Sequence, residues 1–111
     1  MGTTSGSTPE GKVKADVRKL LRQYRAYWHS PVQNGMGTPS LDIIGCMRGL
    51  YFAIECKAPG KKLTPRQMLT KKEIEDSGGI VFVIGESEVH HGPHRYSGMM
   101  DLEVWLLGLL S

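Results

Sequence analysis

The segment from Asp42 to Lys57 constrains the fold of this chain more than any other part of it. Its apolar residues are interrupted by Met47-Arg48-Gly49, so the segment predicts two neighbouring strands joined by a turn. Because side chains alternate between the faces of a strand, Glu55 and Lys57 are expected to point to one face. Three apolar residues of the second strand are expected to point the other way, into a core: Leu50, Phe52 and Ile54.

The position of Asp42 relative to Glu55 depends on the loop between the two strands. An even number of loop residues places the two carboxylates on the same face, about 4.5–8 Å apart as direct or diagonal neighbours. An odd number without a bulge separates them. Two carboxylates and Lys57 on one face form an unfavourable surface unless a divalent cation and an anionic substrate join them.

The composition is typical of one globular domain. The chain has 111 residues, of which 40% are hydrophobic and 23% charged, so it can bury one modest core. No apolar run approaches the roughly 20 residues that span a bilayer, and the polar first residues do not form a secretory signal. We therefore expect a flexible tail over residues 1–8, a single domain over 9–111, no membrane partner and a cytoplasmic location. Cys46 and Cys56, within apolar strands, are expected to be buried reduced thiols.

Two helix starts are clear in the sequence. Thr8-Pro9-Glu10 combines a capping hydroxyl, a proline at the first helical position and an acid in the first turn. Thr64-Pro65-Arg66-Gln67 has the capping-box pattern, and its helix is expected to run to Ser77 before Gly78-Gly79. Helical spacing predicts that the first helix reaches Trp28, through Val13, Val17, Leu20, Leu21 and Tyr24.

The remaining elements predict an α/β sandwich around a mixed sheet. The apolar run Ile80–Ile84 is typical of a strand covered on both faces, and its place after a strand and a helix predicts a parallel crossover. Residues 101–110 predict a last helix that is apolar almost all round. Such a helix must be buried in its own domain or against a second subunit, so we expect an isologous homodimer.

Basic residues concentrate in the first part of the chain. The net charge is +3, but residues 8–29 carry six basic groups against Glu10 and Asp16. Lys61 and Lys62 follow the second predicted strand, and they either contact backbone phosphates or are solvated. Four residues of the first helix form a stripe that is either a solvated face or a track for a polyanion: Lys14, Arg18, Arg22 and Arg25.

The residue types around Glu55 suit phosphodiester hydrolysis. This reaction needs neutralisation of the phosphate charge, an activated water and protonation of the leaving oxygen, which one or two Mg²⁺ ions supply. Asp42 and Glu55 are the candidate ligands, with the backbone carbonyl of Cys56, because the sulfur is too soft for Mg²⁺. Lys57 would orient the water or stabilise developing charge. The alternative is that Asp42 is a strand-end acid and that Glu55 and Lys57 form a plain ion pair.

Together, Asp42, Glu55-Cys56-Lys57 and Thr64-Pro65-Arg66-Gln67 resemble the PD-(D/E)xK nuclease superfamily, specifically its phage-type VRR-NUC branch. The resemblance spans residues 9–84. It implies a restriction-endonuclease-like αβββαβ core, here with an extra C-terminal helix, and DNA cleavage with Mg²⁺ or Mn²⁺. The family's Pro-Asp pair is spread out in this chain as Pro39-Ser40-Leu41-Asp42.

The resemblance also implies roles for single residues. Asp42 and Glu55 would bind the metal and Lys57 would be the catalytic lysine. Gln67 and Glu10 would be accessory, with Glu10 reaching the metal through water. Some members of the branch are dimers that cut branched DNA such as four-way junctions, which points to viral or prophage replication and repair. A catalytically silent DNA-binding module of the same fold is the alternative, and a structural oligomerisation protein without salt-sensitive DNA affinity is a third class.

Other patterns in the sequence are weaker. Pro59–Thr64 is similar to the end of a P-loop, but Gly-Lys is not followed by Ser or Thr, so we expect no nucleotide cofactor. The loop with His90, His91 and His94 either binds adventitious Zn²⁺ or is a mobile surface segment. Three aromatic residues are either core or stacking partners for bases: Tyr24, Tyr27 and Trp28.

Overall fold

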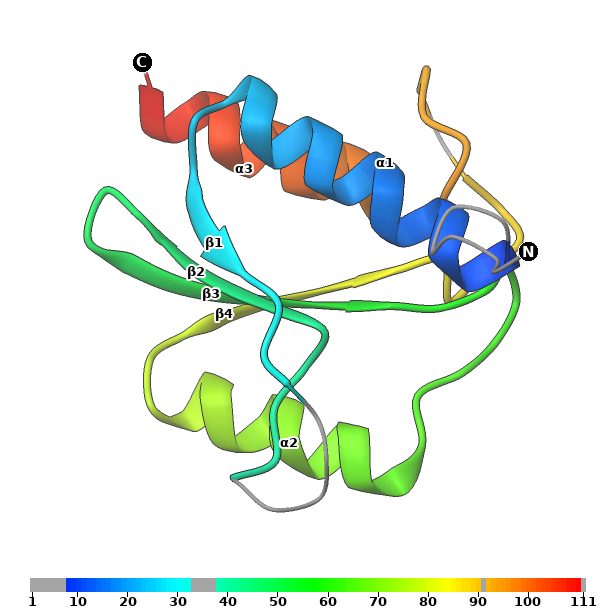
Figure 1. Ribbon diagram of the computed structural model, residues 1–111, viewed down its shortest axis with the longest axis horizontal. Helices are drawn as coiled ribbons and strands as arrows, with labels where there is room; N and C mark the ends of the chain where they lie inside the picture. The colour runs from blue at the N-terminus through cyan, green and yellow to red at the C-terminus, as the bar shows by residue number, and fades with distance from the viewer. Residues whose placement is uncertain (1–7, 33–37, 91, 111) are drawn as a thin grey trace.

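A four-stranded mixed sheet lies between helix α2 on one face and helices α1 and α3 on the other (Figure 1). The computed structural model describes residues 8–32, 38–90 and 92–110, so the predicted tail, apart from Thr8, lies outside the described residues. The element order confirms the predicted α/β class and the αβββαβ order of helices and strands, followed by a last helix. The elements are α1 (Pro9–Gln23), β1 (Tyr27–His29), β2 (Ile43–Met47), β3 (Leu50–Cys56), α2 (Pro65–Asp76), β4 (Ile80–Ile84) and α3 (Met99–Leu110).

The strand order is β1-β2-β3-β4, with antiparallel pairing from β1 to β3 and parallel pairing of β3 with β4. The turn between β2 and β3 consists of Arg48 and Gly49, whose φ angles of 54° and 81° match the type I′ turn that joins twisted strands. The loop therefore has an even length. With Ile43 opposite Ile54, the register places Asp42 directly opposite Glu55.

The core lies between the sheet and the pair α1 and α3. Phe52 and Ile54 of β3 are fully buried there, which confirms their predicted direction. The ring of Trp105 in α3 packs edge-on against Phe52, with 5.6 Å between ring centroids, and against Phe82 at 5.4 Å. Helices α1 and α3 contribute further apolar side chains to this core, among them Val13, Val17, Leu20, Leu21, Leu102 and Leu106.

The prediction that the first helix reaches Trp28 is wrong. The helix α1 ends at Gln23, and Arg25 has a left-handed φ of 57°. The N–H groups of Arg25 and Ala26 donate to the carbonyls of Arg22 and Leu21, which is the Schellman arrangement that closes a helix. Arg25 therefore lies outside the helix and off the predicted basic stripe, and the following residues form the edge strand β1.

Two further predictions about burial are wrong. Cys46 is exposed, although Cys56 is buried as expected, and Leu50 has an exposed fraction of 40%. Both residues lie at the turn end of the β2–β3 hairpin. In Figure 1 this end projects beyond the helices that cover the sheet.

The last helix begins at Met99, two residues before the predicted start. Leu102 and Leu106 are buried within the domain, whereas Val104 and Leu107 are exposed at 58% and 55%. The domain therefore buries one side of α3 only, and the homodimer stays a prediction. Among the described residues, no helix combines the length and apolar character needed to cross a membrane.

Candidate active site

The carboxylates of Asp42 and Glu55 lie together at the end of the β2–β3 pair. The backbone N–H of Asp42 donates to Glu55 Oε1 at 3.2 Å, and the backbone N–H of Cys56 donates to Asp42 Oδ2 at 3.0 Å. Glu55 has an exposed fraction of only 3%. Each carboxylate therefore accepts a hydrogen bond from a backbone N–H of the other strand. The predicted convergence of the two side chains is confirmed.

Lys57 belongs to the same cluster. Its Nζ lies 4.0 Å from Glu55 Oε2, and the residue is 9% exposed. The neighbouring strand positions its backbone, because the N–H of Lys57 donates to the carbonyl of Ile84 at 2.8 Å. Gly85 follows with φ of 92°, and a Cβ there would lie 2.1 Å from the Lys57 carbonyl oxygen, so only glycine fits at this point.

Gln67 reaches the cluster from the start of α2. Its Nε2 donates to Glu55 Oε2 at 2.9 Å, while its Oε1 accepts from the backbone N–H of Thr64 at 3.0 Å. The Thr64 hydroxyl accepts from the Gln67 N–H in return, which confirms the predicted capping box. The cap thus orients the Gln67 amide so that its nitrogen faces the carboxylate.

Lys14 is a member of this cluster that the sequence analysis assigned elsewhere. Its Nζ lies 3.6 Å from Asp42 Oδ1 and 3.2 Å from Glu10 Oε2. Burial would lower the pKa of Lys14, but the carboxylates of Asp42 and Glu10 outweigh it and raise that pKa. Glu10 and Asp42 therefore share Lys14 as a common ion-pair partner. The spacing of Glu10 and Lys14, one helical turn apart, was the signal in the sequence that they form a pair.

The surroundings of Glu55 disfavour its charged form. Burial, followed by the nearby Asp42 carboxylate, raises the pKa of Glu55 to about 8, against the opposing effect of Lys57. Without a cation Glu55 therefore binds a proton more readily than an ordinary glutamate does. Burial also raises the pKa of the Cys56 thiol, so its sulfur stays protonated and is a poor ligand.

The donor set fits a hydrated Mg²⁺ or Mn²⁺ ion. Among the described residues no three His, Cys, Asp or Glu side chains are grouped to hold a metal, as the three or four ligands of a zinc site would be. Mg²⁺, however, keeps several waters and needs only one or two carboxylates, here those of Asp42 and Glu55. The N–H and C=O of one residue point to the same side of a strand. The Cys56 carbonyl therefore faces the side of Asp42, to which its N–H donates.

The loop that contains His94 contacts helix α3. His94 Nε2 lies 2.6 Å from Glu103 Oε1, and the hydroxyl of Tyr24 donates to Glu103 Oε2 at 2.5 Å. The hydrogen bonds from Tyr24 and His94 lower the pKa of Glu103. His94 is thus occupied by a carboxylate of α3, and His91 lies outside the described residues.

The predicted phosphate contacts lie on two segments. Arg18 and Arg22 follow Lys14 along α1 and border the segment around β1, since Arg18 Nη2 donates to the Ser30 hydroxyl at 3.5 Å. The Arg22 guanidinium lies over the Trp28 ring, 5.6 Å from its centroid. Lys61 and Lys62 are exposed in the loop between β3 and α2. Among the predicted phosphate contacts, Lys14 forms an ion pair with a candidate metal ligand, Asp42.

No known protein family model matches the chain, and neither does any curated protein. The resemblance to the PD-(D/E)xK nucleases thus stays a prediction. A function for the site is inferred from its residues and their geometry.

Proposed function

We propose that this protein is a metal-dependent endonuclease that hydrolyses DNA phosphodiester bonds with Mg²⁺ or Mn²⁺. One observation carries the proposal: Asp42 and Glu55 face each other across a strand pair, and Lys57 Nζ lies 4.0 Å from Glu55 Oε2. The αβββαβ order supports a restriction-endonuclease-like core. The buried Glu55, beside the half-buried Asp42 and the buried Lys57, is costly in a merely structural role, whereas a cation and a phosphate give every charge a partner.

The side chains have distinct tasks in this proposal. Asp42, Glu55 and the Cys56 carbonyl hold the ion, which when bound neutralises phosphate charge and lowers the pKa of water. Lys57 places a positive charge where the phosphate gains negative charge in the transition state. Gln67 fixes the orientation of Glu55 through its 2.9 Å hydrogen bond. Lys14 holds Asp42 and links it to Glu10, which acts as an accessory acid.

DNA is the proposed partner because basic side chains lead away from the acid pair. Lys14, Arg18 and Arg22 lie one turn apart along α1, a spacing of about 6 Å along the helix axis. Arg25 lies beyond the helix end and off this line, and Lys61 and Lys62 are exposed in the loop that follows Lys57. Such side chains bind backbone phosphates in any sequence, so we propose selection by DNA structure, for instance branched or four-way junction DNA.

A catalytically silent DNA-binding module is the second candidate. The ion pairs of Asp42 with Lys14 at 3.6 Å and of Glu55 with Lys57 at 4.0 Å favour it, because both acids already have cationic partners. In that case the four side chains only hold the ends of β2 and β3 together.

A panel of labelled DNA substrates separates the two candidates. The panel contains a four-way junction, a flap, a nicked duplex, a linear duplex and a single strand. We expect cleavage of at least one of these with Mg²⁺ or Mn²⁺, no cleavage with EDTA, and recovery when the metal is restored. Intact DNA throughout, together with salt-sensitive binding, would favour the silent module. Absence of both cleavage and binding would favour a structural oligomerisation protein.

A further inference from the structure

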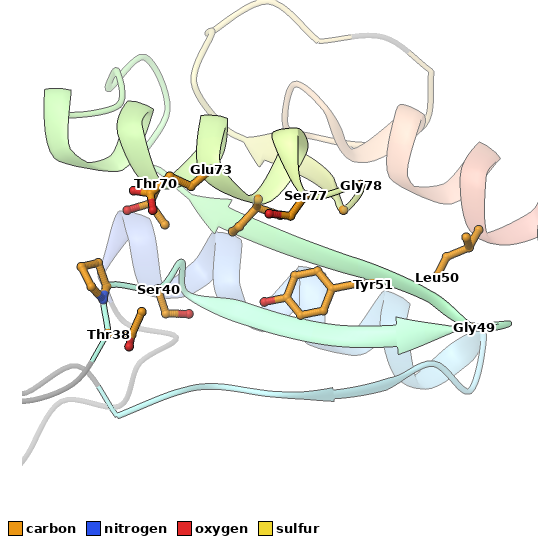
Figure 2. Close-up of a pocket in the computed structure, with 12 residues that line it drawn as sticks. Thr38, Ser40, Gly49, Leu50, Tyr51, Thr70, Glu73, Ser77 and Gly78 are labelled. Atoms are coloured by element: carbon orange, nitrogen blue, oxygen red, sulfur yellow. The ribbon is translucent and has the colours of Figure 1, made fainter.

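A groove of about 550 Å³ lies between α2 and the sheet, next to the candidate active site. Figure 2 shows Tyr51 of β3 lying across this groove, with Thr70, Glu73 and Ser77 of the α2 segment on the opposite wall. The volume falls within the range of ligand pockets in proteins. Polar and apolar side chains line it, among them Ser40, Tyr51, Thr70, Glu73, Ile74 and Ser77.

The groove lies on the sheet face that carries Glu55, and residues near the acid pair in the sequence line it. Ser40 precedes Asp42 by two residues, and Thr70 follows Gln67, the partner of Glu55, by one helical turn. Tyr51 lies on the same strand face as Glu55, four residues and about 13 Å away along β3. A DNA strand with a phosphate at the acid pair therefore has a neighbouring nucleotide within reach of the groove.

The lining of the groove matches a flat, uncharged ligand with N–H donors. Tyr51 is 44% exposed and offers an aromatic surface for stacking. Glu73 offers a carboxylate acceptor: its neighbours Glu75 and Asp76 pair with Lys71 and Lys72, whereas Glu73 has no ion pair among the described residues. Among the described residues that line the groove there is no Lys, Arg or His. A phosphate would thus meet one negative charge and no positive one, which disfavours it.

We propose that the groove binds an unpaired nucleobase of the DNA strand being cleaved. The base stacks on Tyr51, and an amino or imino N–H of its pairing edge donates to Glu73. This inference rests on the proposed nuclease function and gives that function a selection rule. A base that is already unpaired enters the groove at little cost, whereas a paired base must first be extruded from the duplex.

Binding of 2-aminopurine DNA in metal-free buffer tests the proposal without any cleavage. One duplex carries a single unpaired 2-aminopurine and the matched duplex carries it paired with thymine. We expect the wild type to quench the fluorescence of the unpaired base and to bind its duplex about tenfold more tightly than the paired one. Tyr51→Leu and Glu73→Gln should lose this preference, and Tyr51→Phe should retain it.

Two control variants sit away from the groove. Tyr27→Leu removes an aromatic ring that is 69% exposed on the edge strand, and Glu75→Gln removes an acid of α2 that already has a partner. Both should keep the wild-type preference. Equal binding of the two duplexes by the wild type, or an unchanged preference in Tyr51→Leu, would overturn the proposal.

The same measurement separates this proposal from the nuclease proposal. A wild type that cleaves DNA but binds the two duplexes equally refutes the base pocket and leaves the nuclease intact. A wild type that cleaves nothing but prefers the unpaired base through Tyr51 supports the pocket and refutes the nuclease.

Discussion

Lys57→Ala is expected to lower the rate of DNA cleavage by about a hundred- to a thousand-fold, the usual cost of removing one group that stabilises transition-state charge. Lys57 is 9% exposed and its Nζ lies 4.0 Å from Glu55 Oε2. Its charge therefore acts in a site with little water to screen it. Single-turnover cleavage of the best substrate from the DNA panel measures the effect.

The control for this variant is Lys61→Ala, which removes a lysine exposed in the following loop. It should weaken DNA binding slightly and leave the single-turnover rate at saturating protein unchanged. DNA affinity of Lys57→Ala should stay close to that of the wild type, which distinguishes a catalytic role from a binding role. A Lys57→Ala protein that is folded and cleaves at the wild-type rate contradicts the assigned role.

Without metal, the stability of the wild type is expected to fall as the pH rises from about 4.5 to about 8, and Glu55→Gln should remove most of this fall. The pKa of Glu55 is about 8 in the folded protein against 4.5 as the ordinary value. Below pH 4.5 both states bind the proton. Between the two values the unfolded chain releases it and the folded chain keeps it, so stability is lost as the pH approaches 8. The loss is of the order of several kcal/mol, at about 1.4 kcal/mol per pKa unit.

Urea unfolding at pH 5, 6.5 and 8 measures this dependence, with Glu75→Gln as the control, because Glu75 is exposed in α2. Glu55→Gln should be more stable relative to the wild type at pH 8 than at pH 5, and the control should follow the wild-type profile. Mg²⁺ should stabilise the wild type more at pH 8 than at pH 5, since metal binding needs the ionised carboxylate. Parallel profiles for the wild type and Glu55→Gln would show that Glu55 does not have a raised pKa.

The elements that begin or end with characteristic capping residues were predictable from the sequence. Thr64, Pro65 and Gln67 define the start of α2, and Gly78 closes it with φ of 95°. The strand pair was predictable from its alternation. Its register was predictable only in outline, because the sequence did not reveal that Arg48 adopts a left-handed φ of 54° and makes the loop two residues long.

Some predictions were wrong because a residue other than glycine adopts a left-handed backbone conformation. Others were wrong because packing by other elements decides whether a strand residue is buried. The helix α1 ends in a Schellman motif with Arg25 where glycine is usual, so its end carried no sequence signal. Cys46 lies near the turn of the β2–β3 hairpin and is exposed, although the residues around it in the strand are apolar. Periodicity reports which face a residue takes, and it does not report how far a helix extends over that face.

The chemistry of the candidate site and four of its residues were predictable from the sequence, but the place of Lys14 in it was not. Asp42, Glu55, Lys57 and Gln67 converge as expected because strand register and a helix cap position them. The contact of Lys14 with Asp42 was not predictable, because it depends on how α1 crosses the end of the sheet. Such long-range packing leaves no trace in local spacing.

Titration with Mn²⁺, followed by the electron paramagnetic resonance signal of the free ion, tests most directly whether Asp42 and Glu55 form a cation site. We expect saturable binding to the wild type at pH 8, with weaker binding at pH 6 because Glu55 must release a proton. Asp42→Asn and Glu55→Gln should lose this binding, and Asp101→Asn, an exposed acid of α3, should keep it. Mn²⁺ binding that is absent from the wild type, or unchanged in Asp42→Asn, would contradict the account.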